Sequence, residues 1–548
     1  MYIKLYSAHL LGIEGQIVET EVDIAYGLPH FDIVGLPGSA LKESKERVRS
    51  AIRNSGYSFP NKRITVNLAP ADLRKEGAYF DMVIALAILL ADEQLSLPEH
   101  QYTRLQKMLV IGELALNGST RRSTGILPLL MTAKEKGFES VFIPTENEYE
   151  TKWITGIQAI PIAHFNQLIS YVTAQPDPSH PDARMQDSKM LANRVQRPKI
   201  RFSQDATHKD ERNDHPPSET DHAEERMEDI HGQEHVKRAF EIAALGFHHI
   251  LMMGPPGSGK TMFAKRMISL LPALKEDEKL EVAKIHSVAG LGHEDNNWGK
   301  RQFRSPHHTV TTTGMLGGGT PVKPGEVSIA HLGVLFLDEF LEFKREVIES
   351  LREPLEDHRV SITRYHHRFT FPAHFLMILA LNPCPCGYYG YESEQHPCTC
   401  SATQIERYRA KLSGPLYDRI DLHVDVPMIS YEDLVTGSTT MSDNPASNPY
   451  TTEQMKKRIN RGLAFKKERN GSPKANGMLT PREIKAECPL TKPGQELLKT
   501  AFEQLQLSAR GYHKILKVAR TIADLNETEK IDERAIAEAI QYRSLDRK

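Results

Sequence analysis

The sequence is poor in cysteine, has no long apolar run and carries almost no net charge. Its five cysteines include four between Cys384 and Cys400, a distribution that disfavours a disulfide framework and indicates a local metal site. The longest apolar run, residues 82–91, is about half as long as a membrane span and predicts a buried helix. Because the formal net charge is −2, any nucleic-acid contact must come from local basic patches.

The first residues, MYIKLYSAHLLGIEG, lack the charged region and apolar stretch of a secretory signal. We therefore expect a cytoplasmic protein without a membrane partner. A chain of 548 residues is too long for one core and predicts about three folding units. Its 39% hydrophobic and 26% charged residues exclude a wholly disordered or fibrous protein.

Sequence patterns divide the chain into five segments. Residues 1–172 alternate strand-like and helical runs and predict an α+β domain, and residues 173–223 are polar and predict a flexible linker. Residues 224–435 alternate strands with helices, as parallel α/β sheets do. A second linker, 436–452, precedes a helical domain, 453–548. The expected elements are strands at 64–70, 108–116, 140–144, 248–253, 333–339 and 375–382, and helices at 40–52 and 261–271.

The motif GPPGSGKT at 254–261 follows a predicted strand and opens a predicted helix, as a phosphate-binding loop does. Its glycines let backbone amides approach phosphates, the lysine neutralises them, and the threonine hydroxyl binds Mg²⁺. ATP and Mg are therefore the expected cofactors. The candidate nucleotide-binding residues are Gly254, Pro255, Pro256, Gly257, Ser258, Gly259, Lys260 and Thr261.

Two carboxylates follow the apolar strand VLFL, at the sheet edge where open α/β sheets bind ligands. We expect Asp338 to hold Mg with Thr261, and Glu339 to orient the attacking water. The alternative is a solvated acidic strand end. Asn382, after another strand, is a candidate for positioning the same water, although an Asn before Pro also often starts a turn.

Four segments resemble the ComM/YifB family of magnesium-chelatase-like AAA+ ATPases. They are DIHGQEHVKRAFEIAALGFHHILMMGPPGSGKT, FRSPHHTVTTTGMLGGGTPVKPGEVSIAHLGVLFLDEF, NPCPCG and LSGPLYDRIDLHVDVP, and the similarity covers residues 1–548 except the linkers. The resemblance implies a AAA+ P-loop NTPase core with a helical C-terminal lid, assembled as a homo-oligomeric, hexameric ring.

The resemblance also assigns two arginines to catalysis. Arg419 corresponds to the arginine finger that enters a neighbouring subunit's site, and a salt bridge with Asp418 or Asp421 is the alternative. Arg510 corresponds to the lid arginine called sensor 2, and Arg520 is its rival.

The N-terminal domain resembles the Lon-protease-like (ChlI-type) fold through GLPHFDIVGLPGSALKESKERVRSAI and KEGAYFDMVIALAIL. The serine and lysine of a Lon-type dyad would fall near residues 78–80 and near Leu127, where this chain has neither. Ser39, Lys42 and Lys45 are of the right types but lie in a helix-opening pattern. We therefore expect this domain to bind or assemble rather than to cleave peptides.

The clustered cysteines form two C-x-C pairs in a loop at 384–400. Cys384, Cys386, Cys398 and Cys400 suffice for a structural Zn site, and four reduced thiols are the alternative because C-x-x-C is the commoner spacing.

Basic residues in two segments, which the resemblance places toward the ring's pore, are the candidate contacts to DNA, branched or single-stranded. The glycine-rich segment 315–321 suits a mobile pore loop, and the helix at 453–470 offers a further basic face. Salt bridges at a subunit interface, and a solvated helix, are the alternatives. The candidates are Lys300, Arg301, Arg304, His307 and His308 in the first segment, and Arg364 and Arg368 in a predicted hairpin.

The resemblance implies a branch-migration helicase for recombination during natural transformation. Two alternatives stay open: a chelatase motor that drives Mg insertion into a tetrapyrrole, and a regulatory remodeller that uses ATP to assemble. The chelatase branch lacks a Lon-like N-terminal domain by the same resemblance, which counts against the first alternative.

Overall fold

The computed structural model describes residues 2–36, 38–71, 75, 77–174, 225–291, 298–364, 367–391, 396–411, 414–428, 449–471 and 474–543. Its contacts divide the chain into two compact units. The first comprises Met1–Thr220, Ala283–Trp298 and Thr320–Lys323, and the second comprises Asp221–Val282, Gly299–Gly319 and Pro324–Lys548. The expected linkers, 173–223 and 436–452, fall mostly outside the described residues.

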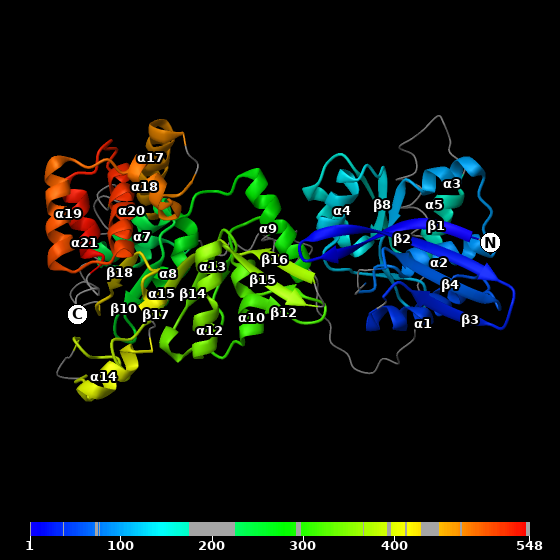
Figure 1. Cartoon of the computed structure of the whole chain (residues 1–548), viewed down its shortest axis with the longest axis horizontal. Coiled ribbons are helices and arrows are strands. Elements are labelled where there is room, and N and C mark those ends of the chain that lie inside the picture. Colours follow the sequence, from blue (N-terminus) through cyan, green and yellow to red (C-terminus); the bar gives the residue numbers. More distant parts are fainter. Residues whose placement is uncertain are drawn as a thin grey trace, which may run out of the picture. The chain divides into compact units, whose positions relative to one another are not determined.

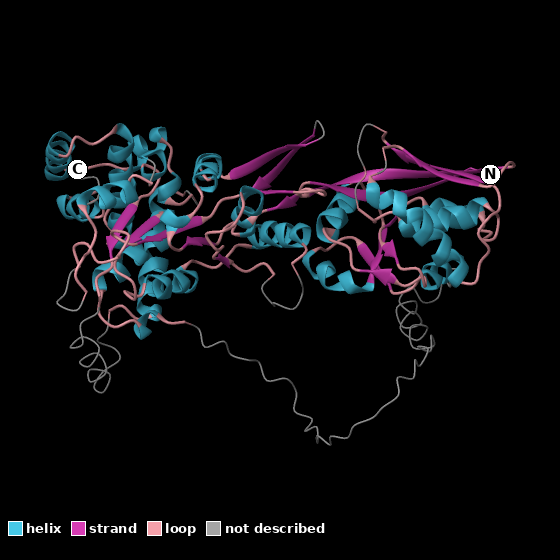
Figure 2. Cartoon of the chain, turned by 90° about the horizontal axis from the view of Figure 1, so that it is seen from below, coloured by secondary structure: helices cyan, strands magenta, loops and turns pink. Residues whose placement is uncertain are grey.

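The first unit is built on a seven-stranded sheet with the order β3-β4-β2-β1-β5-β8-β9 (Figure 1). The two longest strands pair antiparallel from Tyr2 opposite Asp23 to Leu11 opposite Glu14, and form long ribbons near the N-terminus (Figure 2). Strands β3, β5, β8 and β9 join by parallel pairing. The strands are β1 Tyr2–Leu11, β2 Glu14–Ala25, β3 His30–Val34, β4 Arg63–Ala69, β5 Met108–Val110, β8 Ser140–Pro144 and β9 Gln158–Ile162.

Helix α2, Asp81–Ala91, is buried along its whole length, which confirms the buried helix predicted from the apolar run. The predicted helix at 40–52 is also confirmed, within α1 Ser39–Asn54. The single strand predicted at 108–116 is wrong. The strand stops at Val110, because the Gly112 backbone is bonded outside the sheet: its amide donates to the Tyr79 carbonyl at 2.8 Å and its carbonyl accepts the Met82 amide at 3.2 Å. Glu113–Leu114 then forms the short strand β6. The remaining elements are α3 Glu99–Leu105, β7 Thr120–Arg121, α4 Ile126–Glu135, the 3-10 helix Thr145–Trp153 and α5 Phe165–Thr173.

A segment from the middle of the sequence belongs to this first unit. Ser287, near the end of helix α9 (Glu276–Ala289), donates its hydroxyl to Glu150 at 2.5 Å, and its carbonyl accepts from the Gly125 amide at 2.9 Å. Glu150 is 1% exposed, and burial raises the pKa of its carboxyl. The carboxylate also accepts from the Leu127 amide and the Asn147 side chain, so its burial is matched by hydrogen bonds.

The second unit contains a five-stranded parallel sheet with the order β11-β14-β17-β10-β18 (Figure 1). Its three central strands are buried at every residue, as expected where helices cover both faces of a parallel sheet. This confirms the strands expected around 248–253, 333–339 and 375–382. The strands are β10 Ile250–Met253, β11 Phe303–Arg304, β14 Val334–Leu337, β17 Leu376–Leu381 and β18 Leu422–Asp425.

Helices α17 to α21 follow this sheet in sequence and begin at side-chain caps. Thr451, Ser508 and Asp532 each accept a backbone N–H of the following helix, and Thr480 does so ahead of Pro481. Among the helices that the structure describes, none has the length and apolar character of a membrane span. The helices of this unit include α7 Glu234–Gly246, α8 Lys260–Leu270, α10 Thr312–Leu316, α11 Glu326–Ile329, α12 Arg345–Ser350, α13 Arg352–Asp357, α14 Ala402–Arg409, α15 Gly414–Tyr417, α17 Thr452–Asn470, α18 Pro481–Glu487, α19 Lys492–Gln504, α20 Ala509–Leu525 and α21 Glu533–Gln541.

Candidate active site

The predicted phosphate-binding loop connects β10 to α8, as the motif requires. Lys260 is the first residue of α8, and its Nζ donates to the carbonyls of Gly254 at 2.8 Å and Pro255 at 2.9 Å. It is 8% exposed, and burial lowers the pKa of its ammonium. Gly257 and Gly259 have φ of 78° and 89°, a region that L side chains rarely adopt, so the loop depends on glycine there.

Two carboxylates lie at the end of β14, beside this loop. Thr261 donates its hydroxyl to Asp338 Oδ2 at 2.9 Å, so a hydroxyl and a carboxylate, the oxygen ligands that Mg²⁺ prefers, face one another. Glu339 adopts φ of 48° and its side chain is 59% exposed. The backbone therefore presents this carboxylate away from the strand, where it can meet a solvent molecule.

A third strand completes the site. Asn382 directly follows β17, and its Oδ1 accepts from Lys260 Nζ at 3.3 Å. Three neighbouring strands thus bring together Lys260, Asp338 and Asn382, which lie up to 122 residues apart in the sequence. This arrangement of an ammonium, two oxygen ligands and an amide is suited to phosphoryl transfer, because that reaction requires the positioning of groups and the neutralisation of charge.

His308 lies at this site too, although the sequence predicted it among DNA contacts. Its Nδ1 is 3.6 Å from Glu339 Oε2, and its ring meets Phe343 edge-on at 6.4 Å between centroids. No local sequence pattern indicates this contact, because helices α10 and α11 and strand β14 all lie between the two residues.

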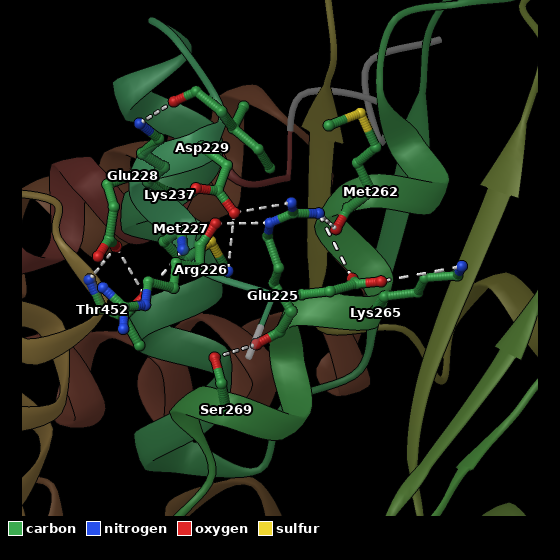
Figure 3. Close-up of polar contacts among 12 residues, drawn as sticks. Glu225, Arg226, Met227, Glu228, Asp229, Lys237, Met262, Lys265, Ser269 and Thr452 are labelled. Atoms are coloured by element: carbon green, nitrogen blue, oxygen red, sulfur yellow. Dashed lines mark hydrogen bonds and ion pairs between the residues drawn. The ribbon is translucent and has the colours of Figure 1, made fainter. Parts of the chain in front are cut away.

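Residues 225–230 connect the helix after the loop with the C-terminal helices (Figure 3). Thr452, the first residue of α17, donates its hydroxyl to Glu228 Oε2 at 2.8 Å and accepts the Met227 amide at 2.8 Å. On the other side, Arg266 of α8 donates to the Arg226 carbonyl at 2.6 Å and pairs with Asp229 at 3.2 Å. This segment therefore links α8 to α17 through backbone and carboxylate contacts.

The two candidate arginines share one carboxylate. Arg419 and Arg510 both pair with Glu356 Oε1 of α13, Arg510 at 3.4 Å. Arg510 is 59% exposed, whereas Arg520 is fully buried against Asp524 at 2.9 Å and donates to the carbonyls of Thr528 and Glu529. Arg520 thus ties the end of helix α20 to the segment that follows it, and Arg510 stays the predicted lid arginine.

The candidate basic contacts separate into paired and exposed residues. Arg304 forms two hydrogen bonds with Glu326, at 2.7 and 2.8 Å, and Arg301 donates to the carbonyls of Pro272 and Leu332. Arg364 and Arg368 are exposed on the hairpin of β15 (Arg359–Arg364) and β16 (His367–Pro372), which confirms that predicted hairpin. On α17, Arg458, Arg461 and Arg469 pair with Glu241, Glu527 and Asp524 respectively.

The four clustered cysteines come together in the loop after Asn382. The Sγ atoms of Cys384, Cys386, Cys398 and Cys400 all lie within 4.8 Å of one another, and all four are free thiols. This group of residues could hold a metal ion, as expected from their spacing.

The positions where a Lon-type dyad would fall are apolar and buried. Phe80 and Leu127 are both 0% exposed, and the Leu127 amide donates to Glu150 at 2.8 Å. Neither position offers a nucleophile or a base.

Comparisons with known proteins cover the whole chain. Family models match residues 20–147 (Subunit ChlI of Mg-chelatase), 226–434 (Magnesium chelatase, subunit ChlI) and 450–543 (Magnesium chelatase, subunit ChlI C-terminal). The chain is 36% identical over 541 residues to Competence protein ComM of Haemophilus influenzae, covering 99% of this chain and 97% of that protein. It is 36% identical over 537 residues to YifB of Escherichia coli, covering 98% and 96%. A match of 26% over 139 residues to Lon protease 2 of Bacillus subtilis covers 25% of this chain and 24% of that protein.

Proposed function

This chain belongs to the ComM/YifB family of magnesium-chelatase-like AAA+ ATPases, and we propose that it is a cytoplasmic, ATP-hydrolysing ring motor that acts on DNA. In this proposal it migrates branched DNA during recombination, including that of natural transformation. The observation that carries the proposal is the convergence of Lys260, Asp338, Glu339 and Asn382 at one edge of the parallel sheet, in a chain similar to Competence protein ComM over 99% of its length.

In the proposed reaction, Lys260 binds the β and γ phosphates, and the hydroxyl of Thr261 and the carboxylate of Asp338 hold Mg²⁺. The bound ion neutralises charge on the phosphates. Glu339 accepts a hydrogen bond from the attacking water and Asn382 fixes its direction. The 59% exposure of Glu339 and the short reach from Lys260 to Asn382 support these roles.

We propose that Arg419 acts in the site of a neighbouring subunit of a hexameric ring, and that Arg510 contacts the nucleotide of its own subunit. Both arginines pair with the Glu356 carboxylate, which supports coupled roles for them. If one arginine moves toward a nucleotide, the other still neutralises that carboxylate. Arg419→Ala should then remove most hydrolysis while leaving nucleotide binding intact.

DNA is the proposed partner, and the hairpin β15–β16 is the favoured contact. Arg364 and Arg368 are exposed there, whereas Arg301 and Arg304 are engaged within the chain. Exposed guanidinium groups suit a phosphate track.

A chelatase motor is the second candidate, because the family models carry that description. The model that matches residues 20–147 is also described as a chelatase subunit, so the N-terminal region does not separate the two functions. The third candidate, a regulatory remodeller, would bind ATP to assemble without doing mechanical work.

The deciding experiment measures ATP hydrolysis by the full chain with forked DNA, four-way junctions, single-stranded DNA and no DNA, together with strand displacement. We expect branched DNA to raise the hydrolysis rate and ATP to drive displacement. Arg364→Ala with Arg368→Ala should reduce both effects, and Lys107→Ala, on an exposed lysine of the first unit, should not. Hydrolysis without stimulation or displacement would contradict the DNA motor.

A further inference from the structure

Three of the four cysteine sulfurs have the spacing of ligands around one tetrahedral metal ion, and the fourth, of Cys400, lies within 4.8 Å of each of them. Cys384 Sγ lies 3.2 Å from Cys386 Sγ and 3.8 Å from Cys398 Sγ, and Cys386 Sγ lies 3.5 Å from Cys398 Sγ. Four thiolates around Zn²⁺, each at about 2.3 Å, would lie about 3.8 Å apart. A disulfide would require about 2.05 Å, and all four thiols are free. The donor set therefore fits a thiophilic divalent ion.

The loop that carries these cysteines packs on the phosphate-binding loop. Cys384 is buried and stands two residues after Asn382. Gly387 adopts φ of 91°, and a Cβ atom there would lie 2.6 Å from the Pro256 ring. A side chain at 387 would therefore push the two loops apart, so the cysteine loop forms part of the wall around the nucleotide-binding residues.

The far end of the cysteine loop fixes the start of helix α14. Ser401, next to Cys400, accepts the Gln404 amide on its hydroxyl at 3.3 Å, and the Gln404 side-chain oxygen accepts the Ser401 amide at 2.9 Å. Arg409, at the end of the helix, donates to the Pro383 carbonyl at 3.1 Å and lies over the Tyr389 ring at 5.2 Å. Both ends of α14 are thus tied to the loop that the four thiols would close.

Residues of helix α14 and the proposed hydrolytic residues line one cavity of about 470 Å³. Its lining includes Glu339, Asn382, Arg407 and Lys411. Lys411 Nζ lies 3.6 Å from Glu342 and donates to the Leu341 carbonyl at 3.1 Å. Arg407 is exposed, and within the described parts of the chain no carboxylate pairs with it. It is therefore a cation directed at the cavity that contains Glu339.

We propose that Cys384, Cys386, Cys398 and Cys400 bind one Zn²⁺, and that this ion positions α14 so that Arg407 faces Glu339 and Asn382. In this proposal the Arg407 guanidinium attracts anionic groups in the cavity and so positions them for hydrolysis. The part about hydrolysis rests on the proposed function, whereas zinc binding does not. Zinc should be needed for turnover and not for nucleotide binding, because the phosphate-binding loop keeps its own hydrogen bonds.

The first experiment measures zinc in the purified full chain by mass spectrometry and compares wild type with a Cys398→Ser, Cys400→Ser double variant. We expect one zinc per chain in wild type and less than about a tenth of that in the double variant, because two of four ligands are lost. Cys488→Ala, which alters an isolated buried cysteine, is the matched control and should keep its zinc. A wild type that contains no zinc and takes up none overturns the proposal.

The second experiment compares turnover with nucleotide affinity. The double variant should hydrolyse ATP at least about tenfold more slowly while its affinity for a fluorescent ADP analogue changes less than about twofold. Zinc should restore turnover to chelator-treated wild type and not to the double variant. Zinc-free protein that turns over at the wild-type rate overturns the link to hydrolysis. If wild type hydrolyses no ATP, the proposed function fails, and the zinc content still decides the metal site.

The third experiment tests Arg407 with the zinc in place. Arg407→Ala should lower kcat several-fold at normal zinc content and nucleotide affinity, and Arg407→Lys should recover part of the loss. Glu406→Ala, on an exposed neighbour in the same helix, should leave kcat unchanged. Equal activities of the alanine variant and wild type overturn the role of Arg407.

Discussion

The two compact units of this protein differ in what stands at their candidate functional positions. In the second unit, Asp338 and Asn382 follow strands of the parallel sheet and meet Thr261 and Lys260 at the start of helix α8. In the first unit, the positions where a Lon-type dyad would fall hold buried apolar residues: Phe80, just before helix α2, and Leu127 in helix α4. The comparison shows that buried packing and polar site chemistry depend on different residues, so a well-packed unit need not carry a reactive group.

The largest expected effect is the loss of hydrolysis in Lys260→Ala. The substitution removes the ammonium at the centre of the loop, so phosphate release should fall to background, roughly 10³-fold or more. Lys265→Ala, on the exposed face of the same helix, should hydrolyse normally. Turnover by Lys260→Ala would mean that the polar site of the parallel sheet is not catalytic.

Glu339→Gln should come second, with kcat lower by about 10²- to 10⁴-fold, because the amide cannot accept a proton from water. ATP binding, measured by fluorescence titration, should persist, and the protein should stall as an assembled ring in ATP. Glu346→Gln, on an exposed residue of helix α12, is the control and should hydrolyse normally. Normal turnover by Glu339→Gln would remove this residue from the proposed reaction.

In the first unit, Phe80→Ala should cost stability rather than activity of the nucleotide site. Phe80 is 0% exposed, and truncating a buried phenylalanine typically costs about 3–5 kcal/mol of unfolding free energy. Thermal unfolding should show the loss, and nucleotide affinity should be unchanged. Tyr26→Ala, at a residue that is 96% exposed, should change stability by less than about 0.5 kcal/mol. A Phe80→Ala protein as stable as wild type would contradict this.

The smallest expected effect is acid sensitivity of the second unit. Burial lowers the pKa of His249 to about 4 and that of His374 to about 3, from the ordinary 6.5. The unfolded chain therefore binds more protons below pH 6.5, so stability is complete above that pH and falls as the pH drops toward 4.

His374→Phe, which keeps the ring contact with Phe247, should retain more stability at low pH, on the order of 2 kcal/mol at pH 5. Unfolding curves at pH 7 and pH 5 measure it, and His100→Gln, at an exposed histidine, should behave as wild type. Equal pH slopes for His374→Phe and wild type would exclude His374 as a source of the sensitivity.

The sequence predicted the parallel sheet well, because continuous apolar runs such as VLFL are long enough to mark buried strands without reference to distant residues. It also placed Asp338 and Asn382 at strand ends and Lys260 in the loop before a helix, and parallel topology brings these positions together. The strand predicted at 108–116 was too long, because apolar residues continue beyond Val110 to Gly112, whose backbone bonds to Tyr79 and Met82 instead of a neighbouring strand.

Side-chain partners could not be predicted from the sequence. Arginine reaches partners that no local pattern indicates, so Arg304 pairs with Glu326, and Arg419 with Glu356, 63 residues away. The contact between His308 and Glu339, the proposed base, likewise joins residues that no local sequence pattern connects. These pairings depend on tertiary packing, which spacing along the chain does not encode.

The hydrogen bond from Ser287 to the buried Glu150 bears on how this protein could have been inherited. The first unit is completed by residues that lie more than a hundred positions downstream, inside the stretch that encodes the nucleotide site. An exchange of the N-terminal coding sequence between genes would separate a buried carboxylate from one of its donors. Recombination between the coding sequences of residues 1–220 and 283–298 is therefore disfavoured, and we expect these two parts of the chain to be inherited together.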